Sequence, residues 1–328
     1  MTKVSITPDN IEFEIQPNEN ILAAGLNHKL NLPHRCKNGV CGSCKCKVVS
    51  GSVIHDEYNK ETLSDIELLE GYALLCKAHA TTDVILNIPN LLGGFPIKML
   101  PAKVESCTKV KETAIIKLKI PSTMEFGFYA GQYIDILLNG KNRSYSIANS
   151  PANRGIIELH VKYHASGLFS EFVWNEIKDE QLLRFRGPLG SFYLQDTKNP
   201  IVFVCTGTGF APVKAILEDM LLKNNQRPIH FYWGNRTLDD FYLLELLSAW
   251  QQKLNLKVTL CLSQEIHEGY RQGWVTDAIK NDFTDLSAYE VYACGNPKMT
   301  EEVFLYATQE INLDKNNFFS DAFTPSVV

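Results

Sequence analysis

The sequence lacks an excess of positive charge and lacks any long apolar run. Its 37 aspartates and glutamates outnumber its 32 lysines and arginines, for a formal net charge of -5, which gives no electrostatic basis for binding nucleic acid. No uninterrupted apolar segment approaches the ~18 residues of a membrane-spanning helix, and the N-terminus has no basic segment followed by an apolar one. We therefore expect a cytoplasmic protein with no nucleic-acid partner and no membrane span.

A disulfide framework is also not expected. The nine cysteines are an odd number for such a framework, and a reducing compartment would not maintain one. Four of the nine fall within residues 36–46. This local cluster therefore requires an explanation in metal or redox chemistry.

The length and composition are those of a folded chain with more than one domain. Of the 328 residues, 45% are hydrophobic and 21% are charged, which is ordinary for globular proteins. At roughly 150 residues per domain, the chain accommodates two domains or three compact ones. We place the domains at residues 1–92, 100–197 and 198–328, with residues 93–99 as a linker.

The hydrophobic patterns differ between these three ranges. The first range has strand patterns at residues 4–6, 11–15, 45–54 and 84–88, and helices that begin at Asn20 and Ser64. The second range predicts an antiparallel β-barrel, with strands at residues 114–120, 133–138 and 156–162 and a helix near residues 170–177. The third range predicts a doubly wound parallel sheet, because strands at residues 201–204, 229–232 and 257–260 alternate with helices at residues 213–222 and 243–254.

The cysteine cluster has the spacing of a plant-type [2Fe-2S] site. Cys36, Cys41 and Cys44 are separated by four and then two residues, and Cys76 supplies a fourth thiol. Thiolates bind iron strongly, and the glycines at positions 39 and 42 allow the backbone to wrap closely around a cluster. We therefore predict that these four cysteines are the ligands.

A structural zinc site is the alternative, because Cys41, Cys44, Cys76 and His79 imitate a Cys3His ligand set. That alternative leaves Cys36 without a role. A Rieske centre is less favoured, since His34 precedes its cysteine. Of the other five cysteines, Cys107, Cys205 and Cys261 lie in apolar strand patterns and Cys46 is interpreted as a small buried residue, so these four are expected in the core. The fifth is Cys294.

Three further segments have features of phosphate or ring binding. Arg143–Ser146 offers an arginine for charge-assisted bonds and a tyrosine that could stack on a flat ring. Gly167–Ser170 opens a predicted helix, where free N–H groups favour anions. Gly207–Pro212 joins a buried strand to a helix through two glycines, although its spacing departs from the Gly-x-Gly-x-x-Gly fingerprint.

Together with Gly187–Phe192, these segments resemble the ferredoxin-NADP reductase superfamily. The resemblance implies a multi-domain protein with a β-grasp plant-type ferredoxin domain, an antiparallel β-barrel FAD domain and an α/β doubly wound NAD(P)H-binding domain. It also implies FAD as the flavin, because the Gly167–Ser170 element holds the FAD pyrophosphate in that family.

The resemblance assigns roles residue by residue. For FAD it implies a phosphate contact from Arg143, a ring contact from Tyr145, a place near the reactive N5 for Ser146, and further contacts from Ser144, His160, Val161, Lys162, Gly167, Phe169 and Ser170. For the nicotinamide nucleotide it implies Gly207, Thr208, Gly209, Pro212, Asn235, Arg236, Asp240, Cys294, Gly295, Asp321 and Phe323. The groups expected to act at the reacting atoms are Ser146, Cys294 and Phe323.

Two details remain open at this point. Arg236 would favour the 2′-phosphate of NADPH, whereas Asp239 or Asp240 would accept bonds from the free ribose of NADH, and we favour NADH. Phe323 is the expected ring over the flavin, with Phe319 as the alternative.

A three-part electron path follows from this set of cofactors. Nicotinamide gives up two electrons as a hydride and a [2Fe-2S] cluster accepts one at a time, so a flavin is needed between them. The expected partner is an electron-acceptor protein. Residues 130–150, 228–234 and 318–323 resemble the reductases of dideoxysugar synthesis, which implies a pyridoxamine-phosphate (PMP)-dependent sugar dehydrase as the acceptor. An oxygenase component is the alternative acceptor, and a zinc-stapled protein or simple electron carrier without flavin is the alternative of another class.

Overall fold

The computed structural model describes residues 2–34, 37–40, 42–88, 91 and 94–323. The chain divides into two compact units. The first unit comprises residues 1–98 with 187–191, and the second comprises residues 99–186 with 192–328. Among the helices of the described residues, none is long and apolar enough to cross a bilayer.

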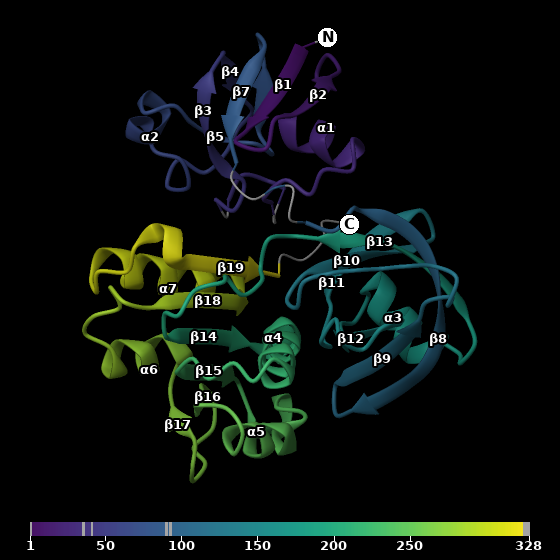
Figure 1. Cartoon of the computed structure of the whole chain (residues 1–328). Coiled ribbons are helices and arrows are strands. Elements are labelled where there is room, and N and C mark those ends of the chain that lie inside the picture. The colour runs from purple at the N-terminus through teal and green to yellow at the C-terminus, as the bar shows by residue number, and fades with distance from the viewer. Residues whose placement is uncertain (1, 35–36, 41, 89–90, 92–93, 324–328) are drawn as a thin grey trace. The chain divides into compact units, whose positions relative to one another are not determined.

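The first unit is built on a mixed sheet with the strand order β2-β1-β7-β3-β5. Its strands are β1 (Thr2–Thr7), β2 (Ile11–Ile15), β3 (Lys45–Ser50), β5 (Tyr72–Leu74) and β7 (Val84–Asn87). A small second sheet pairs β4 (Val53–His55) with β6 (Ala78–Ala80). Helix α1 (Ile21–Asn27) and the short helix α2 (Asp65–Leu69) complete the unit (Figure 1).

Both predicted helix starts are confirmed by their capping bonds. Asn20 Oδ1 accepts a hydrogen bond from Ala23 N at 2.8 Å, and Ser64 forms a capping box with Glu67. The predicted single strand over residues 45–54 is wrong, because Gly51 turns the chain with φ +92° between β3 and β4. A side chain there would meet Asp83 O at 2.1 Å, so the turn requires glycine.

The second unit begins with an antiparallel sheet in the order β11-β10-β13-β8-β9-β12. Its strands are β8 (Lys98–Val110), β9 (Thr113–Lys119), β10 (Tyr133–Leu138), β11 (Lys141–Ser146), β12 (Ile156–Lys162) and β13 (Leu182–Leu189), and helix α3 (Leu168–Asn175) packs on it. An antiparallel bridge between Ile147 and Leu159 links the chain just after β11 to β12. The two ends of the sheet are thereby joined, which closes it into the predicted barrel (Figure 1).

The rest of the second unit is a parallel sheet in the order β17-β16-β15-β14-β18-β19. Its strands are β14 (Ile201–Thr206), β15 (Ile229–Asn235), β16 (Leu256–Leu262), β17 (Arg271–Gln272), β18 (Glu290–Gly295) and β19 (Phe318–Ala322). Its helices are α4 (Phe210–Leu222), α5 (Leu244–Gln251), α6 (Val275–Asp282) and α7 (Pro297–Gln309), with short 3-10 helices η1 (Gly207–Gly209), η2 (Leu238–Asp240) and η3 (Lys315–Asn317).

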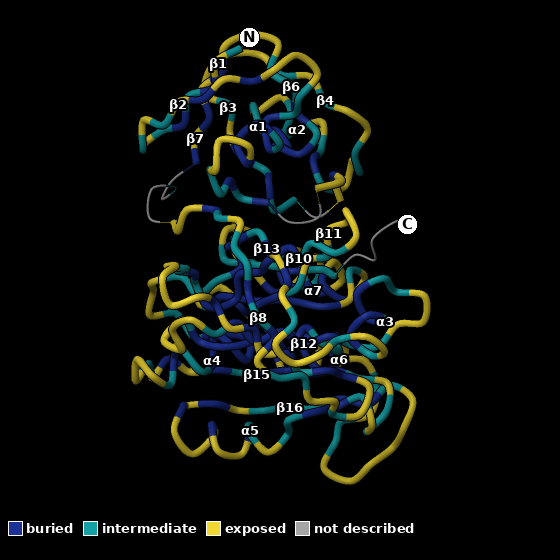
Figure 2. The backbone as a smooth tube through the Cα atoms, turned by 90° about the vertical axis from the view of Figure 1, so that its right-hand side faces the viewer, coloured by how far each residue is buried: buried dark blue, intermediate teal, exposed yellow. Residues whose placement is uncertain are grey.

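The alternation of side chains along β14 shows how this sheet is covered on both faces. Phe203 packs in a core cluster with residues of α4 and α5, whereas Val202 and Val204 pack in a separate cluster with residues of α6 and α7. All of β14 except its last residue is buried, and the neighbouring strand β15 is mostly buried as well (Figure 2). The predicted doubly wound arrangement is therefore confirmed.

Candidate functional site

The first unit brings together two of the four predicted cluster ligands. Cys44 immediately precedes β3 and Cys76 follows β5, and these strands pair with Lys45 opposite Leu74. As a result the Sγ atoms of Cys44 and Cys76 lie 3.3 Å apart, and both side chains are buried. Two thiols at this separation can serve one metal ion, so they fit the soft donor set that iron requires.

The loop around these thiols also needs the glycines found in it. Gly39 has φ +83° and Gly42 has φ +72°, a region that other residues rarely adopt. A Cβ atom on Gly39 would lie 2.8 Å from Tyr58 Cβ. Cys36 and Cys41, the other two predicted ligands, lie outside the described residues.

His79 does not join these cysteines. It lies on β6, where its Nε2 is 2.9 Å from Asp56 Oδ2, and within the described residues no group of three or more potential metal ligands is found. The other cysteines are mostly core residues as expected. Burial raises the pKa of the Cys46 thiol to about 12, and Cys205 and Cys261 are fully buried. Cys107 is only half-buried, because β8 leaves part of its length at the surface.

The predicted flavin segments meet on the barrel. Tyr145 on β11 and Phe169 in the first turn of α3 have ring centroids 5.0 Å apart, so the Arg143–Ser146 and Gly167–Ser170 elements are neighbours. Burial raises the pKa of the Tyr145 hydroxyl above its ordinary value. The Arg143 guanidinium is bonded only to the adjacent Asn142 O, at 2.8 Å, among the contacts found for it.

Other side chains of these segments hold the segments in shape. Ser144 Oγ donates to Asp135 Oδ1 of β10 at 2.6 Å. Ser170 Oγ donates to His164 O at 2.8 Å and accepts from His164 N at 3.2 Å. A Cβ atom on Gly167 would lie 2.5 Å from that hydroxyl oxygen and 3.0 Å from His164 O, so a larger residue would displace the Ser170 hydroxyl, and Gly167 offers no side chain to cap the helix. The first-turn N–H groups of α3 thus fit a phosphate group.

The dinucleotide loop lies where three parallel strands end. Gly207 N donates to Asn235 Oδ1 of β15 at 3.1 Å, and Cys294 Sγ of β18 lies 2.9 Å from Gly209 O. A Cβ atom on Gly209 would lie 2.5 Å from Cys294 O. Gly207 has φ +54° and open space where its side chain would be, so the loop presents a backbone surface of the kind that a pyrophosphate approaches closely.

One buried donor in this loop lacks a partner. Asn235 Nδ2 is buried and makes no hydrogen bond, which is costly unless a ligand accepts from it. This observation fits a bound dinucleotide. Pro212 lies in the first turn of α4, as predicted, where its missing N–H is tolerated.

The expected reacting groups are assembled by β19. In the register of β18 and β19, Cys294 lies opposite Asp321, and Asp321 Oδ2 accepts a hydrogen bond from Ser146 Oγ at 3.1 Å. Phe323 N donates to Gly295 O at 2.7 Å, and the Phe323 side chain is half-buried. Phe319, the alternative ring, instead stacks on Tyr292 with centroids 4.7 Å apart, so it belongs to the core of the parallel sheet.

Two residues predicted for different cofactors pair with each other. Lys162 Nζ of the barrel lies 2.5 Å from Asp240 Oδ1. Burial raises the pKa of the Asp240 carboxyl, but the hydrogen bond and charge of Lys162 outweigh it and hold the pKa below its ordinary value. Arg236 is 63% exposed, with Nε 3.6 Å from Asp240 Oδ2. A cavity of about 550 Å³ lies here, lined by Lys111, Glu112, Arg236, Thr237, Asp239, Asp240 and Gln264.

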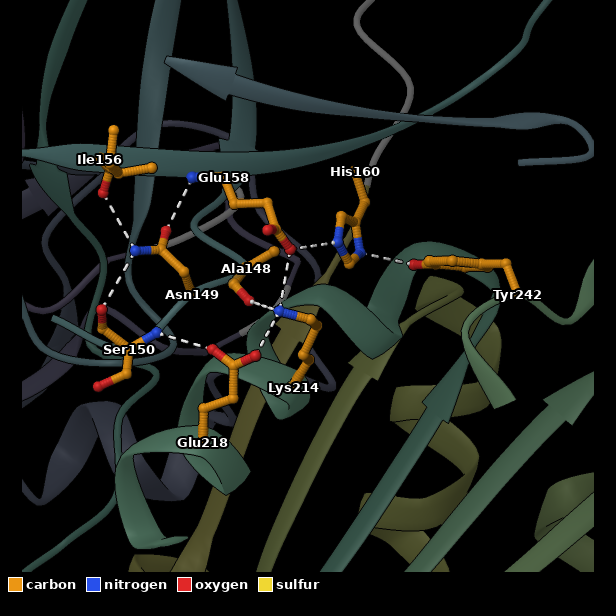
Figure 3. A network of polar contacts seen from close by, with 9 residues as sticks. All are labelled: Ala148, Asn149, Ser150, Ile156, Glu158, His160, Lys214, Glu218 and Tyr242. Carbon is orange, nitrogen blue, oxygen red and sulfur yellow. Dashed lines mark hydrogen bonds and ion pairs between the residues drawn. The ribbon is translucent and has the colours of Figure 1, made fainter. Parts of the chain in front are cut away.

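The side chains of His160 and Val161 face in opposite directions. Val161 is part of the barrel core. His160 is buried against Glu158 and Tyr242, with ring nitrogens 3.0 Å from Glu158 Oε1 and 2.9 Å from Tyr242 Oη (Figure 3). Burial lowers the pKa of the His160 imidazole more strongly than Glu158 raises it, so the ring is neutral, with Nε2 donating to the carboxylate and Nδ1 accepting from the tyrosine.

The sequence analysis missed a second set of residues around His160. Lys214 of α4 is buried and pairs with Glu158 and Glu218 (Figure 3). Burial raises the pKa of the Glu158 carboxyl, but the His160 hydrogen bond and the Lys214 charge outweigh it and lower the pKa to about 2. The available signal was a lysine in an otherwise apolar stretch of helix, residues 210–217.

Comparisons with known proteins agree with this geometry. Three family models match: the 2Fe-2S iron-sulfur cluster binding domain over residues 4–81, the oxidoreductase FAD-binding domain over residues 101–193, and the oxidoreductase NAD-binding domain over residues 203–304. A CDP-6-deoxy-L-threo-D-glycero-4-hexulose-3-dehydrase reductase of Yersinia pseudotuberculosis serotype I (strain IP32953) is 38% identical over 330 residues, which cover 98% of each chain. This chain belongs to that family of flavin iron-sulfur reductases.

Two further relatives span the whole reductase. The reductase component of propane 2-monooxygenase from Mycolicibacterium smegmatis (strain ATCC 700084 / mc(2)155) is 32% identical and covers 99% of this chain and 98% of its own. The crystal structure of the cytochrome P450 reductase GcoB from Amycolatopsis matches with a TM-score of 0.80 at 27% identity, covering 99% of each chain.

The family confirms the predicted class of enzyme. The reductase is an NAD(P)H-dependent flavin iron-sulfur oxidoreductase with FAD, a [2Fe-2S] cluster and NADH as its cofactors. The predicted fold class is confirmed in all three parts. Its relatives include reductase components of larger enzyme systems, and the reductase passes electrons to a partner protein.

Proposed function

We propose that this reductase delivers electrons to a PMP-dependent dehydrase that acts on a CDP-sugar in 3,6-dideoxyhexose synthesis. The observation that carries this proposal is full-length similarity to a protein named as the reductase of a CDP-hexulose dehydrase, at 38% identity. The similarity to the propane 2-monooxygenase reductase is lower, at 32% over a comparable length. The higher identity to the dehydrase reductase is what favours a dehydrase over an oxygenase component as the partner.

The residues of each unit have separate tasks in this function. When bound, FAD accepts a hydride and releases its electrons singly, which a [2Fe-2S] cluster can carry. Arg143, Tyr145 and the start of α3 hold the flavin, and the loop Gly207–Gly209 holds the dinucleotide. Cys44 and Cys76 bind the cluster together with the two cysteines outside the described residues.

Three residues stand at the reacting atoms in this proposal. Ser146 presents its hydroxyl to the flavin and is oriented by Asp321, whose Oδ2 accepts from it. Cys294 lies beside the dinucleotide loop, 2.9 Å from Gly209 O. The main chain of Phe323 is bonded to Gly295, and in this proposal its ring would cover the flavin until nicotinamide enters.

A reductase component of an aromatic-ring or diiron oxygenase is the second candidate. It is favoured by the full-length match to the propane 2-monooxygenase reductase and by the likeness to the P450 reductase GcoB. In this case the same path through FAD and cluster would end at an oxygenase component.

A reconstituted reaction separates the two candidates. The purified reductase and NADH are combined with a PMP-loaded CDP-sugar dehydrase and its substrate, or with an oxygenase component and its substrate, and product is measured by chromatography. We expect deoxygenated CDP-sugar to form at one equivalent per NADH consumed. Product only in the oxygenase reaction would contradict the proposal. Cytochrome c reduction in both samples serves as the control for an active reductase.

We also propose that the protein works in the cytoplasm, where NADH is available and thiols remain reduced. Cell fractionation with antibody detection tests this. Recovery of the reductase with an extracytoplasmic marker enzyme would contradict it.

A further inference from the structure

A buried polar network joins the barrel to helix α4 of the parallel sheet (Figure 3). Along β12, Ile157, Leu159 and Val161 point into the barrel core, so Glu158 and His160 point outward. Both of these polar side chains are nevertheless buried, because α4 and Tyr242 cover them. The outward face of β12 is therefore a contact between the flavin-binding and dinucleotide-binding parts of the second unit.

Lys214 is at the centre of this contact. Its ammonium group has three donors, and three acceptors lie around it: Ala148 O at 2.9 Å, Glu158 Oε1 at 2.9 Å and Glu218 Oε1 at 2.6 Å. Two of these acceptors belong to the barrel and one to α4. Since a buried ion pair contributes little net stability, the value of such an arrangement lies in fixing one geometry.

Further hydrogen bonds also join the barrel to α4. Glu218 Oε2 accepts from Ser150 N at 3.1 Å, and Ser150 Oγ donates to Asp219 Oδ1 at 3.2 Å. On the barrel side, Asn149 Oδ1 accepts from Glu158 N at 2.7 Å. The segment 148–150 is thus fastened to one side of α4 at several points.

The bonded residues are close in sequence to the flavin-binding segment and to the dinucleotide loop. Ala148 follows Ser146 by two residues, and Lys214 follows Gly209 by five. The Lys214 bonds therefore run from the segment that carries the flavin serine to the helix that begins at the dinucleotide loop. Hydride transfer requires reacting atoms about 3–3.5 Å apart, and an error of about 1 Å can cost a hundredfold in rate.

We propose that Lys214 is a positioning residue for hydride transfer: its buried bonds to Ala148 O and Glu158 fix the dinucleotide loop relative to the flavin-binding strand, and its bond to Glu218 holds the ammonium group in place. This inference depends on the reductase activity and is independent of which protein accepts the electrons. It predicts that removal of the ammonium group slows the reduction of bound flavin and has little effect on the affinity for NADH.

The test uses the holoenzyme and three variants. Lys214→Met removes the ammonium group but leaves Glu158 and Glu218 as two buried carboxylates. The double variant Lys214→Met/Glu158→Gln removes one positive and one negative charge, so the net charge of the cluster is unchanged while the Lys214 bonds to the barrel are lost. It is the variant to measure if the single variant folds poorly. Lys280→Met is the control, because Lys280 of α6 also joins two elements of the second unit: its Nζ lies 2.8 Å from Glu302 Oε1 of α7, and both side chains are half-exposed.

Two measurements distinguish positioning from simple loss of structure. In anaerobic stopped-flow experiments with NADH and its 4-deuterated form, we expect the double variant to reduce flavin at least about tenfold more slowly at saturation. Its NADH dissociation constant should stay within about threefold, and its deuterium isotope effect should be larger than that of the parent. In hydrogen exchange, amides of residues 207–214 and 146–150 should exchange faster in the double variant and remain unchanged in Lys280→Met.

Equal saturating rates in the parent and the double variant would overturn the proposal. So would a slower rate explained entirely by weaker NADH binding. The proposal would also be overturned if Lys280→Met lost as much rate as the double variant, because the effect would then come from general destabilisation.

Discussion

Gly209 shows how one missing side chain brings the dinucleotide loop and the reacting groups together. Its backbone passes so near the end of β18 that a Cβ atom would lie 2.5 Å from Cys294 O. The residue has φ -57°, which any amino acid adopts. Glycine is therefore required here for space and not for backbone conformation.

Gly209→Ala isolates that steric requirement. Because main-chain atoms must shift to admit a methyl group, we expect a loss of about 1–3 kcal/mol in unfolding free energy and weaker NADH binding. Denaturant titration and equilibrium binding of NADH measure the two effects. Gly155→Ala is the control for NADH affinity alone: nothing lies within 4 Å of a Cβ atom there, but its φ of +79° strains an alanine, so this variant should lose stability while its NADH affinity matches the parent. Unchanged NADH affinity in Gly209→Ala would contradict the close approach of loop and strand.

Ser146 and Asp321 form the second critical contact at this scale. Replacing Asp321 by asparagine keeps the size but weakens acceptance of the Ser146 hydrogen bond. We expect flavin content to remain at the level of the parent and the anaerobic rate of flavin reduction to fall on the order of tenfold. An unchanged rate would contradict the role of Asp321 in orienting Ser146.

His160 makes the stability of the protein depend on pH. Its imidazole is buried and its pKa lies below the ordinary value of 6.5, so the unfolded chain binds a proton that the folded chain does not. The contribution of this group is present above about pH 6.5 and is lost as pH falls below it. Unfolding free energies of the parent and His160→Gln, measured from pH 8 to about pH 5, should converge as the pH falls. Parallel curves would show that His160 does not titrate in this way.

At the scale of elements, strands and helices followed from sequence patterns, while their charged contacts did not. The caps at Asn20 and Ser64 were predictable because capping is local. The split between β3 and β4 was missed because the turn at Gly51 depends on Asp83, which lies far along the chain. The Lys214 network was missed for a similar reason. Lysine and glutamate are ordinarily surface residues, and only the packing of α4 on β12 buries them.

The candidate site was predictable to the extent that it consists of motifs. The cysteine spacing, the Arg143–Ser146 segment and the Gly207–Pro212 loop each lie within a short stretch of sequence. The location of Phe319 could not be predicted in this way, because it depends on the pairing of β19 with β18, which puts Phe319 opposite Tyr292. The pairing of Lys162 with Asp240 could not be predicted from the sequence either, since it joins residues 78 positions apart.

A second buried ion pair joins the start of β18 to the segment just before β15 in the parallel sheet. Arg227 lies 2.7 Å from Glu290 Oε2, with both side chains nearly inaccessible, and Arg227 also donates to Asn199 O at 2.6 Å. Arg227→Met would leave the Glu290 carboxylate buried without its charge partner. We expect a loss of about 3–5 kcal/mol in unfolding free energy, measured by denaturant titration. Arg236→Met at an exposed position should change stability by less than about 0.5 kcal/mol, and an equally small effect of Arg227→Met would contradict the role assigned to the pair.

At the scale of the whole molecule, the two units divide the chemistry of the electrons. Hydride chemistry belongs to the second unit and single-electron chemistry to the first, so damage to one should leave the reactions of the other measurable. This separation gives a test of the full path that does not require the physiological acceptor.

Cys76→Ser should interrupt the path after the flavin. The variant should lose the visible absorption of the [2Fe-2S] cluster and its cytochrome c reductase activity, because a thiolate ligand is missing. NADH-driven reduction of a dye that takes electrons from the flavin should persist. Cys107→Ser, in the second unit, should retain both activities. Full cytochrome c reduction by Cys76→Ser would show that electrons reach the acceptor without the cluster.

The bond between Ser146 and Asp321 also bears on how the enzyme is made. Its two residues lie 175 positions apart, so at typical synthesis rates of about 5–20 residues per second the acceptor is translated about 9–35 s after the donor. Every residue of the barrel is on the nascent chain long before β19 exists. The order of synthesis therefore makes the flavin segments of the barrel available before the strand that completes the nicotinamide site.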